Sequence, residues 1–285
     1  MDKKKNEDEL AEQRFGMLAD IARELAGEVV FPTCFDTVLR LRKELQDPSL
    51  SLARIAQIVQ LEPLVASRLI RLANSATYVS LGEPVRELPS AINRLGLNLV
   101  RATAMAVAVG AILHAKELVS FSEFARSLWE HSVRSAAAAR VLAKTHTRIN
   151  ADEALLAGLV HDLGAFYMLY RAVQYPELRA RPDSLIQVIK DWHEGIGVTL
   201  LETLGLPLEI VQATIDHDQP RPIPSMFRTL ADVVYVGNLL AGGTNEWMRM
   251  DCEAHETDVI LLRERYADLL PEIEIETQEM RVALS

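Results

Sequence analysis

The segment Ala157-Gly158-Leu159-Val160-His161-Asp162-Leu163-Gly164 places an adjacent histidine and aspartate inside an apolar, helix-forming run. Neighbouring helical residues point about 100° apart, so both side chains can border one site without facing each other. A neutral imidazole nitrogen beside a carboxylate oxygen suits a divalent metal such as manganese, iron or zinc. Because two ligands do not hold a metal, other segments must supply the rest. A second pair, His217-Asp218, runs into Gln219-Pro220 and is typical of a helix end.

The sequence on both sides of this segment predicts helices separated by short breaks. Proline, glycine and capping residues mark the ends of these helices, and no run alternates as a strand would. We expect helices at about 1–28, 33–45, 52–60, 63–73, 89–95, 97–113, 121–144, 151–171, 184–204, 207–217, 225–241 and from 257. The chain is therefore predicted to be all-α. An acidic tail at 271–279 follows the last helix, and solvated disorder is the default expectation for it.

The composition limits the classes of function. A net charge of −10 over 285 residues argues against a broad electrostatic grip on nucleic acid or anionic membrane. Cys34 and Cys252 lie far apart in sequence and fit a reducing compartment better than a disulfide framework. Residues 1–9 are charged and unlike a signal peptide, and the longest uncharged run, 102–113, is too short to span a bilayer. We expect a cytoplasmic protein without membrane or nucleic-acid partners.

Three motifs occur in a characteristic order along the chain. Glu62-Pro63-Leu64 precedes Leu72-Ala73-Asn74-Ser75-Ala76, then comes Ala91-Ile92-Asn93-Arg94-Leu95-Gly96, and the His161-Asp162 segment is third. With these motifs, residues from about 31 to 241 resemble the HDOD domain, a branch of the HD metal-dependent phosphohydrolase superfamily. Glu62, Pro63, Asn74 and Ser75 are the most specific motif residues, and a ligand or partner contact near Asn74 is left open.

The resemblance implies two packed helical bundles, the second with HD-type topology. We expect a leader helix at 1–28, an HDOD domain at 29–245 and a C-terminal helix with the acidic tail at 246–285. Within the domain, the N-terminal bundle would cover about 29–115 and the HD-like bundle about 116–245. The resemblance also implies a role in bacterial signal transduction. We expect a non-catalytic output module that contacts signalling proteins, and a homo-oligomer is left open.

In catalytic relatives of the HD superfamily, an early histidine, a His-Asp pair and a late aspartate surround a metal. The matching positions here are His131, the pair His161 and Asp162, and Asn238, whose neutral amide is a poorer ligand than a carboxylate. Asp232 lies six residues earlier and points to a different face of its helix. Two-metal relatives place further ligands where His193 and His217 stand, although each alone is more typical of a surface or core histidine.

These departures make us expect no catalytic residues and no obligatory cofactor. The His131, His161 and Asp162 cluster is then a structural remnant or a site for manganese, iron, nickel or zinc without turnover. One alternative is a metal-dependent phosphohydrolase that uses the same three residues. A second is a DNA-binding regulator, because Arg68 and Arg71 share one face of a predicted helix-turn-helix. Cyclic-dinucleotide phosphodiesterase activity is disfavoured, because Ala165 stands where that branch has lysine and no Gly-Tyr-Pro follows His217.

Overall fold

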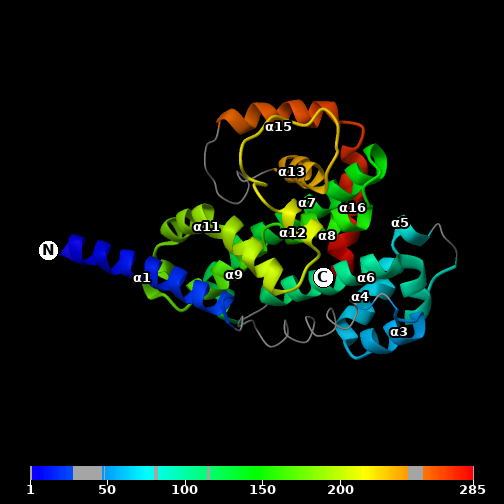
Figure 1. Cartoon of the computed structure of the whole chain (residues 1–285), viewed down its shortest axis with the longest axis horizontal. Helices are drawn as coiled ribbons and strands as arrows, with labels where there is room; N and C mark the ends of the chain where they lie inside the picture. The colour runs from blue at the N-terminus through cyan, green and yellow to red at the C-terminus, as the bar shows by residue number, and fades with distance from the viewer. Residues whose placement is uncertain are drawn as a thin grey trace.

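The computed structural model describes residues 2–27, 47, 49–79, 83–113, 116–242 and 253–284 (Figure 1). Its helices are α1 (Asp2–Leu25), α3 (Leu52–Gln60), α4 (Pro63–Ala73), α5 (Ala76–Val79), α6 (Leu88–Leu113), α7 (Ser122–His146), α8 (Ala151–Val160), α9 (Leu163–Ala172), α10 (Pro176–Ala180), α11 (Pro182–Thr203), α12 (Leu208–Ala213), α13 (Leu230–Leu240), α15 (Glu253–Arg265) and α16 (Leu270–Leu284), with a 3-10 helix at Lys116–Phe121. These ranges contain no strand, and the all-α prediction is confirmed. The helix predicted at 33–45 and both cysteines lie outside the described residues.

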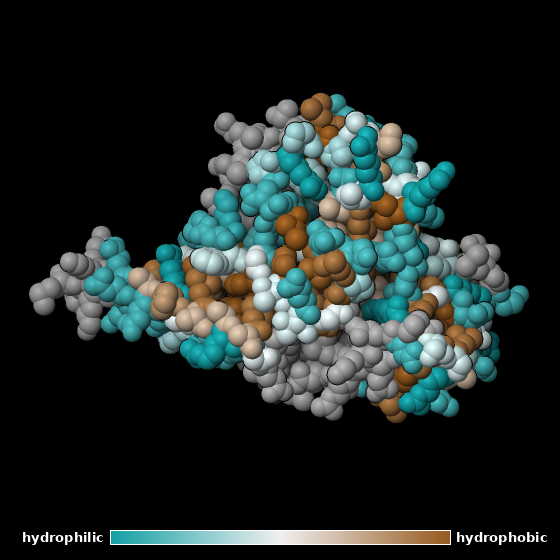
Figure 2. Space-filling view, viewed as in Figure 1, coloured by the Kyte–Doolittle hydropathy of each residue, from teal (hydrophilic) through white to brown (hydrophobic). Residues whose placement is uncertain are grey.

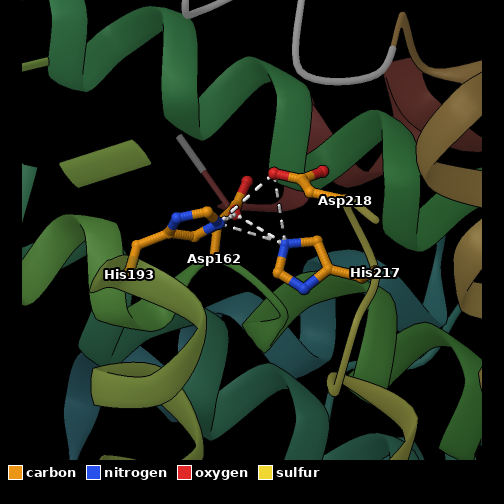
Figure 3. Close-up of side chains that lie close together, drawn as sticks. All are labelled: Asp162, His193, His217 and Asp218. Carbon is orange, nitrogen blue, oxygen red and sulfur yellow. Dashed lines mark hydrogen bonds and ion pairs between the residues drawn. The ribbon is translucent and has the colours of Figure 1, made fainter. Parts of the chain in front are cut away.

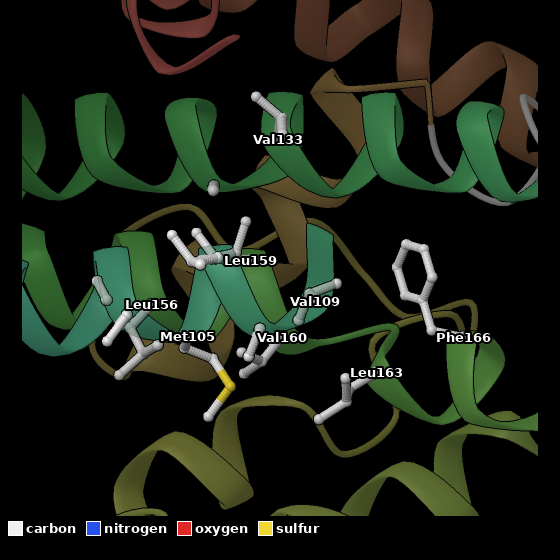
Figure 4. Packing of buried hydrophobic residues seen from close by; sticks show 14 of the residues in the cluster. Met105, Val109, Val133, Leu156, Leu159, Val160, Leu163 and Phe166 are labelled. Atoms are coloured by element: carbon white, nitrogen blue, oxygen red, sulfur yellow. The ribbon is translucent and has the colours of Figure 1, made fainter. Parts of the chain in front are cut away.

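The N-terminal bundle follows its sequence signals closely. The Ser51 side chain accepts a hydrogen bond from the Arg54 amide and caps α3, and Pro63 occupies the first turn of α4. Gly96 has a φ of 77°, which is a conformation that glycine adopts readily, and it bends α6 between its short first part and its long apolar part. That apolar part lies in the core, where Met105 and Val109 pack near Leu156 and Val160 (Figure 4).

The HD-like bundle is built on the alanine run of α7. A Cβ on Gly158 of α8 would lie 2.8 Å from Ala136 Cα, and one on Gly237 of α13 would lie 3.0 Å from the Ala139 nitrogen. Small residues on both sides therefore let α8 and α13 approach α7 at backbone distance. This close packing places the segment that follows α8 near the middle of α7.

The structure corrects two of the predicted helices. Residues 151–171 are not one helix, because α8 ends at Val160 and α9 begins at Leu163, which leaves His161 and Asp162 in a turn. The helix predicted at 207–217 is shorter than expected, because α12 ends at Ala213. The leader helix docks through Met17 and Ile21, which are almost completely buried, with Leu10, Leu18 and Leu25 partly buried against the core.

The acidic tail is also ordered, contrary to the expectation of solvated disorder. Residues Leu270–Leu284 form α16, which packs against α4, α6 and α7. Its Glu276 is buried because the side chain meets Arg140, a residue 136 positions earlier in the chain. An acidic composition predicts solvation only when no buried cation neutralises it.

The visible surface in Figure 2 is mainly hydrophilic, with hydrophobic residues in separate patches. None of the described helices is both long and apolar enough to cross a membrane.

Candidate metal centre

Six polar side chains from four separate segments converge inside the HD-like bundle. His131 lies in the middle of α7, His161 and Asp162 lie in the α8–α9 turn, and His193 lies in α11. His217 and Asp218 follow α12. The first five residues are each only 1 % exposed, and the side chain of Asp218 is 10 % exposed. These six residues are called the His/Asp centre below.

The turn between α8 and α9 lets both members of the His161-Asp162 pair face the same space. In an uninterrupted helix the two side chains would point about 100° apart. Here the helix stops at Val160, and Asp162 stands before the first turn of α9, with its carbonyl accepting bonds from the Ala165 and Phe166 amides. Both side chains consequently reach the same group of ligand atoms.

Three of the histidines are oriented by bonds to backbone carbonyl groups. Nδ1 lies 2.7 Å from the Gly158 oxygen in His161, 2.9 Å from the Ile189 oxygen in His193 and 2.8 Å from the Thr214 oxygen in His217. A carbonyl can only accept, so each Nδ1 carries the proton in the neutral ring and each Nε2 presents its lone pair to the centre. Metal-binding histidines are commonly fixed in this way.

The ligand atoms form two groups that share Asp162. In the first group, His131 Nε2 lies 3.3 Å from His161 Nε2, and Asp162 Oδ2 lies 3.7 and 3.2 Å from these two nitrogens. In the second group, His193 Nε2 and His217 Nε2 lie 3.4 Å apart, and Asp162 Oδ1 lies 3.6 and 3.2 Å from them (Figure 3). Asp218 Oδ2 closes the second group at 3.3 Å from His193 Nε2 and 3.7 Å from His217 Nε2.

Five of these eight separations, at 3.2–3.4 Å, match the first coordination sphere of a divalent cation, and the other three are 3.6–3.7 Å. Ligands about 2.1 Å from a metal lie about 3.0–3.4 Å from their neighbours in octahedral or tetrahedral geometry. In addition, Asp162 Oδ2 and Asp218 Oδ2 are buried acceptors without a hydrogen-bond partner. Mixed imidazole and carboxylate ligands suit manganese, iron, nickel or zinc. The His/Asp centre can therefore hold a metal, with Asp162 placed to contact both groups.

The charges of the metal-free centre are balanced by protons. Burial alone would lower the pKa of His217, but the Asp218 and Asp162 carboxylates outweigh it and raise that pKa to about 10. Burial opposes ionisation of Asp218, yet the neighbouring His217 and His193 lower its pKa to about 2. The pKa of Asp162 is likewise well below its ordinary value because His161 and His217 outweigh burial. Burial lowers the pKa of His131 to about 4. A bound cation would replace the protons on this cluster.

Asn238 supports the centre from α13. Its Nδ2 donates to Asp218 Oδ1 at 2.9 Å and to the His217 carbonyl at 3.1 Å. Asn238 therefore holds the turn that carries both residues, and its own Oδ1 is buried without a partner. Asp232, the other candidate on this helix, forms a capping box instead: its Oδ2 accepts bonds from the Arg228 and Thr229 amides, each at 2.9 Å.

The sequence interpretation missed Asp218. It treated His217-Asp218 as the end of a helix that runs to residue 217, but α12 ends at Ala213 and the pair lies in the segment that follows. The available signal was that the chain contains two His-Asp pairs, each of which stands in a turn after a helix. His193 and His217, which singly were more typical of surface or core histidines, are both buried in the same centre.

The most specific motif residues lie elsewhere and have structural contacts. Asn74 ends α4, donates from Nδ2 to the Ile70 and Val85 carbonyls, and accepts at Oδ1 from the Val85 amide at 2.7 Å. It thereby joins the end of α4 to the segment before α6. Glu62 and Pro63 start α4, and Ser75 follows Asn74 with its hydroxyl group buried and without a hydrogen-bond partner.

A cavity of about 620 Å³ lies where the two bundles meet. Asn98 and Arg101 line it from α6, and Asp152, Glu153 and Ile210 line it from the HD-like bundle. Arg71, a residue of the proposed DNA-binding face, donates to the Val282 carbonyl of α16 at 2.7 Å.

Comparison with solved structures gives the fold an independent context. A candidate metal-dependent phosphohydrolase from Shewanella amazonensis SB2B matches 96 % of this chain and all of its own, with 22 % identity and a TM-score of 0.74. An HDOD domain protein of unknown function from Geobacter sulfurreducens matches 95 % of this chain and 99 % of its own, with 20 % identity and a TM-score of 0.58. A candidate signal transduction protein from Marinobacter aquaeolei VT8 matches 97 % of this chain and 66 % of its own, with 20 % identity and a TM-score of 0.58.

At these identities the structures support the fold and do not identify an activity. No protein of curated function matches the sequence. The HDOD domain family matches residues 31–220, which include both His-Asp pairs and the Asn74 motif. The chain belongs to the HDOD domain family.

Proposed function

We propose that this chain is a non-catalytic signalling module that acts through protein contact and holds a divalent cation in its His/Asp centre. The proposal rests on two properties of the centre: its ligand atoms converge on one space, and its side chains are shielded from solvent. Its ligand atoms have the spacing of a coordination sphere, yet its side chains are almost completely buried. A cation in such a place would stabilise the packing of α7, α9 and α11.

Burial of the centre favours a structural cation over a catalytic one. A hydrolytic metal needs an open coordination position for water and a path for the substrate. Here five of the six side chains are only 1 % exposed, which leaves little room for a phosphoester beside the ligand atoms. The amide Asn238 stands where a catalytic relative has a carboxylate, which lowers the negative charge available to the metal.

A metal-dependent phosphohydrolase is the second candidate, because the two carboxylate oxygens of Asp162 face two different groups of ligands. This arrangement is typical of sites in which a carboxylate bridges two cations. Metal at such a site would supply a water molecule of lowered pKa. Two solved structures from Shewanella amazonensis SB2B that share the fold are described as candidate phosphohydrolases, one of them metal-dependent.

Metal content tests the first part of the proposal. The protein would be purified without a histidine tag from medium containing manganese, iron, nickel and zinc, and analysed by elemental mass spectrometry. We expect about one or two metal ions per chain, lost in His131→Ala. His146→Ala is the matched control, because His146 lies on the same helix but is exposed. Wild-type protein without metal, or equal loss in both variants, would contradict a cation at this centre.

Turnover tests the second part. The metal-loaded protein would be incubated with bis(p-nitrophenyl) phosphate and p-nitrophenyl phosphate, and we expect no release of p-nitrophenol above a metal-only blank. Turnover in the wild type that disappears in His161→Ala would replace the signalling proposal with the phosphohydrolase.

A further inference from the structure

The helix α16 covers a groove that is lined by the most specific motif of the family. It lies along α4, α5, α6 and α7 and is itself outside the residues that match the family, 31–220 (Figure 1). Thr77, next to the Asn74-Ser75-Ala76 motif, donates its amide to the Glu279 carboxylate at 3.0 Å. Residues Arg71, Leu72, Tyr78, Thr103, Ala106 and Arg140 line this α4–α7 groove.

The face that α16 buries is unusually polar for a core helix. Ile273, Glu276, Thr277, Met280 and Ala283 form the buried stripe, and two of the five carry polar groups. Glu276 is held by Arg140 at 2.7 Å, and Arg140 also donates to the Tyr78 hydroxyl. Burial raises the pKa of Glu276 even though Arg140 opposes this effect. Because desolvation offsets much of the attraction in a buried ion pair, this contact fixes the position of α16 more than it adds stability.

Charge complementarity defines the kind of helix that fits the groove. Arg71 and Arg140 meet α16 from the groove, Arg71 through the Val282 carbonyl and Arg140 through Glu276. Lys144 pairs with Glu272 at the rim at 3.3 Å. Arg281 of α16 forms one pair of the opposite sense, because it donates to Glu130 of α7 at 2.6 Å. The acids of α16 nevertheless meet basic groups in a chain whose net charge is −10, so this positive charge is local.

The groove is also larger than the helix that lies in it. A cleft of about 430 Å³ follows one edge of α16, between Arg71, Asn74 and Ser75 on one side and Gln278 and Val282 on the other. A smaller cavity of about 20 Å³ lies beneath Met280 and Ala283, against Leu72 and Leu99. Incomplete filling weakens the packing contribution of a helix, because atoms that border a void lack contacts on that side.

From these contacts we infer that the α4–α7 groove is a docking surface for an acidic amphipathic helix of a partner protein, and that α16 is its autoinhibitory occupant. The partner helix carries an apolar residue, an acid three positions later and an apolar residue four positions after that, as Ile273, Glu276 and Met280 do. This inference rests on the proposed function, because it specifies the surface through which the module contacts proteins. A tethered helix competes strongly with a free one, so the resting protein binds its partner weakly.

The test uses a fluorescein-labelled peptide of residues 268–285 and the full-length protein, with binding followed by fluorescence anisotropy. Met280→Asp in the protein dislodges α16, and we expect the wild-type peptide to bind this variant at least about tenfold more tightly than the wild-type protein. Ile275→Asp is the matched control, because Ile275 lies on the same helix and is 56 % exposed. It should leave binding as weak as in the wild type. A peptide that itself carries Met280→Asp should bind neither protein.

A milder variant keeps the test decisive. Glu279→Ala removes only the bond to the Thr77 amide and should strengthen peptide binding less than Met280→Asp does. Equal peptide binding by wild type and Met280→Asp would overturn the inference. Global unfolding of Met280→Asp would also overturn it, because α16 would then be an indispensable part of the core. A wild-type dimer that exchanges α16 between two chains, detected by light scattering, would make a second copy the occupant and refute a partner helix.

Failure here and failure of the proposed function can be told apart. Phosphoester turnover with peptide binding as expected would remove the non-catalytic assignment and leave the groove. Absence of both turnover and peptide binding would remove only the groove.

Discussion

Two buried charged clusters join distant parts of this chain, and they differ in how their charges are satisfied. Around Arg140, the guanidinium group donates to Glu276, Asp152 and Tyr78, so the buried cation has acidic partners at 2.7 and 3.3 Å. In the His/Asp centre, four imidazole Nε2 atoms surround two carboxylates, and the Oδ2 atoms of Asp162 and Asp218 have no hydrogen bond. In the first cluster the acids bond directly to a buried guanidinium group, whereas in the second each carboxylate keeps one oxygen that can accept from a cation or a proton.

This difference separates a structural ion network from a ligand site. Buried polar groups are normally hydrogen-bonded, so carboxylate oxygens without a hydrogen bond beside several imidazole nitrogens are typical of a site that can bind a cation. The Arg140 cluster has no such atoms among those described for it and needs nothing further. Four predictions test whether the two clusters really behave differently.

The largest effect is expected for Asp162→Ala, which removes the carboxylate that both groups of ligands share. The metal-free protein should lose about 3–5 kcal/mol of its free energy of unfolding, because His193 and His217 lose a buried partner. Metal should also be absent from the purified variant. Urea denaturation in EDTA and elemental analysis measure the two effects. A variant that keeps its metal would show that Asp162 is not a ligand.

Arg140→Met should destabilise the protein by about 3 kcal/mol, because it leaves Glu276 buried without a counter-charge. The double variant Arg140→Met, Glu276→Leu should recover most of this loss, because no buried charge then remains. Neither change should alter the metal content. Parallel loss of metal would show that the two clusters are coupled and would remove the contrast between them.

Stability should depend on pH in opposite directions with and without metal. Folded His217 keeps its proton up to about pH 10, whereas the unfolded residue loses it near 6.5. Between these values the folded state binds more protons, so the free energy of unfolding of the metal-free protein falls by up to about 1.4 kcal/mol per pH unit. Metal binding requires deprotonated ligands, so the metal-bound protein should gain stability as the pH rises from 7 to 9.

Urea denaturation at pH 7, 8 and 9, with EDTA or with added metal, measures this dependence. His217→Gln in EDTA is the control and should show a flatter profile. An unchanged slope in that variant would assign the pH dependence to other groups.

The smallest effects are expected on α13. Asn238→Asp supplies the carboxylate found in catalytic relatives and should raise resistance to chelators about tenfold. In EDTA this variant should have a free energy of unfolding about 1 kcal/mol lower than that of the wild type, because Asp218 loses its amide donor. Asp232→Asn, on the same helix, weakens the capping box and should lower the free energy of unfolding by about 1 kcal/mol. It should leave metal retention unchanged. Equal metal retention in both variants would show that position 238 does not reach the centre.

The sequence predicted most helices because their signals are local. Ser51, Pro63 and Gly96 act within one turn of their own positions, and the structure places helix starts or bends at each of them. The pair His161 and Asp162 stood out in the sequence itself, His131 came from the resemblance to a family, and the structure brings the three side chains together.

The remaining features depend on contacts between distant segments. The second His-Asp pair marks Asp218 in the sequence, but its place in the centre depends on α11 and the α8–α9 turn, which lie beside it only in the fold. The burial of Glu276 depends on Arg140, so no property of the acidic tail itself indicates that it would be ordered. The turn at His161-Asp162 was missed because apolar residues continue on both sides of it, from Leu159 and Val160 to Leu163 and Ala165, and no proline interrupts them.

The crossing of α9 and α11 sets the geometry of the centre without contributing a ligand. A Cβ on Gly164 would lie 2.6 Å from the Gly197 nitrogen and 2.8 Å from its Cα, so even alanine would push α11 away from α9. Gly164 stands two positions after Asp162, and Gly197 stands four positions after His193. Ancestral or engineered chains could therefore keep all six polar side chains and still lose cation affinity through one added methyl group. The ligands alone therefore do not describe such a centre, because the glycine that sets the spacing between them matters as well.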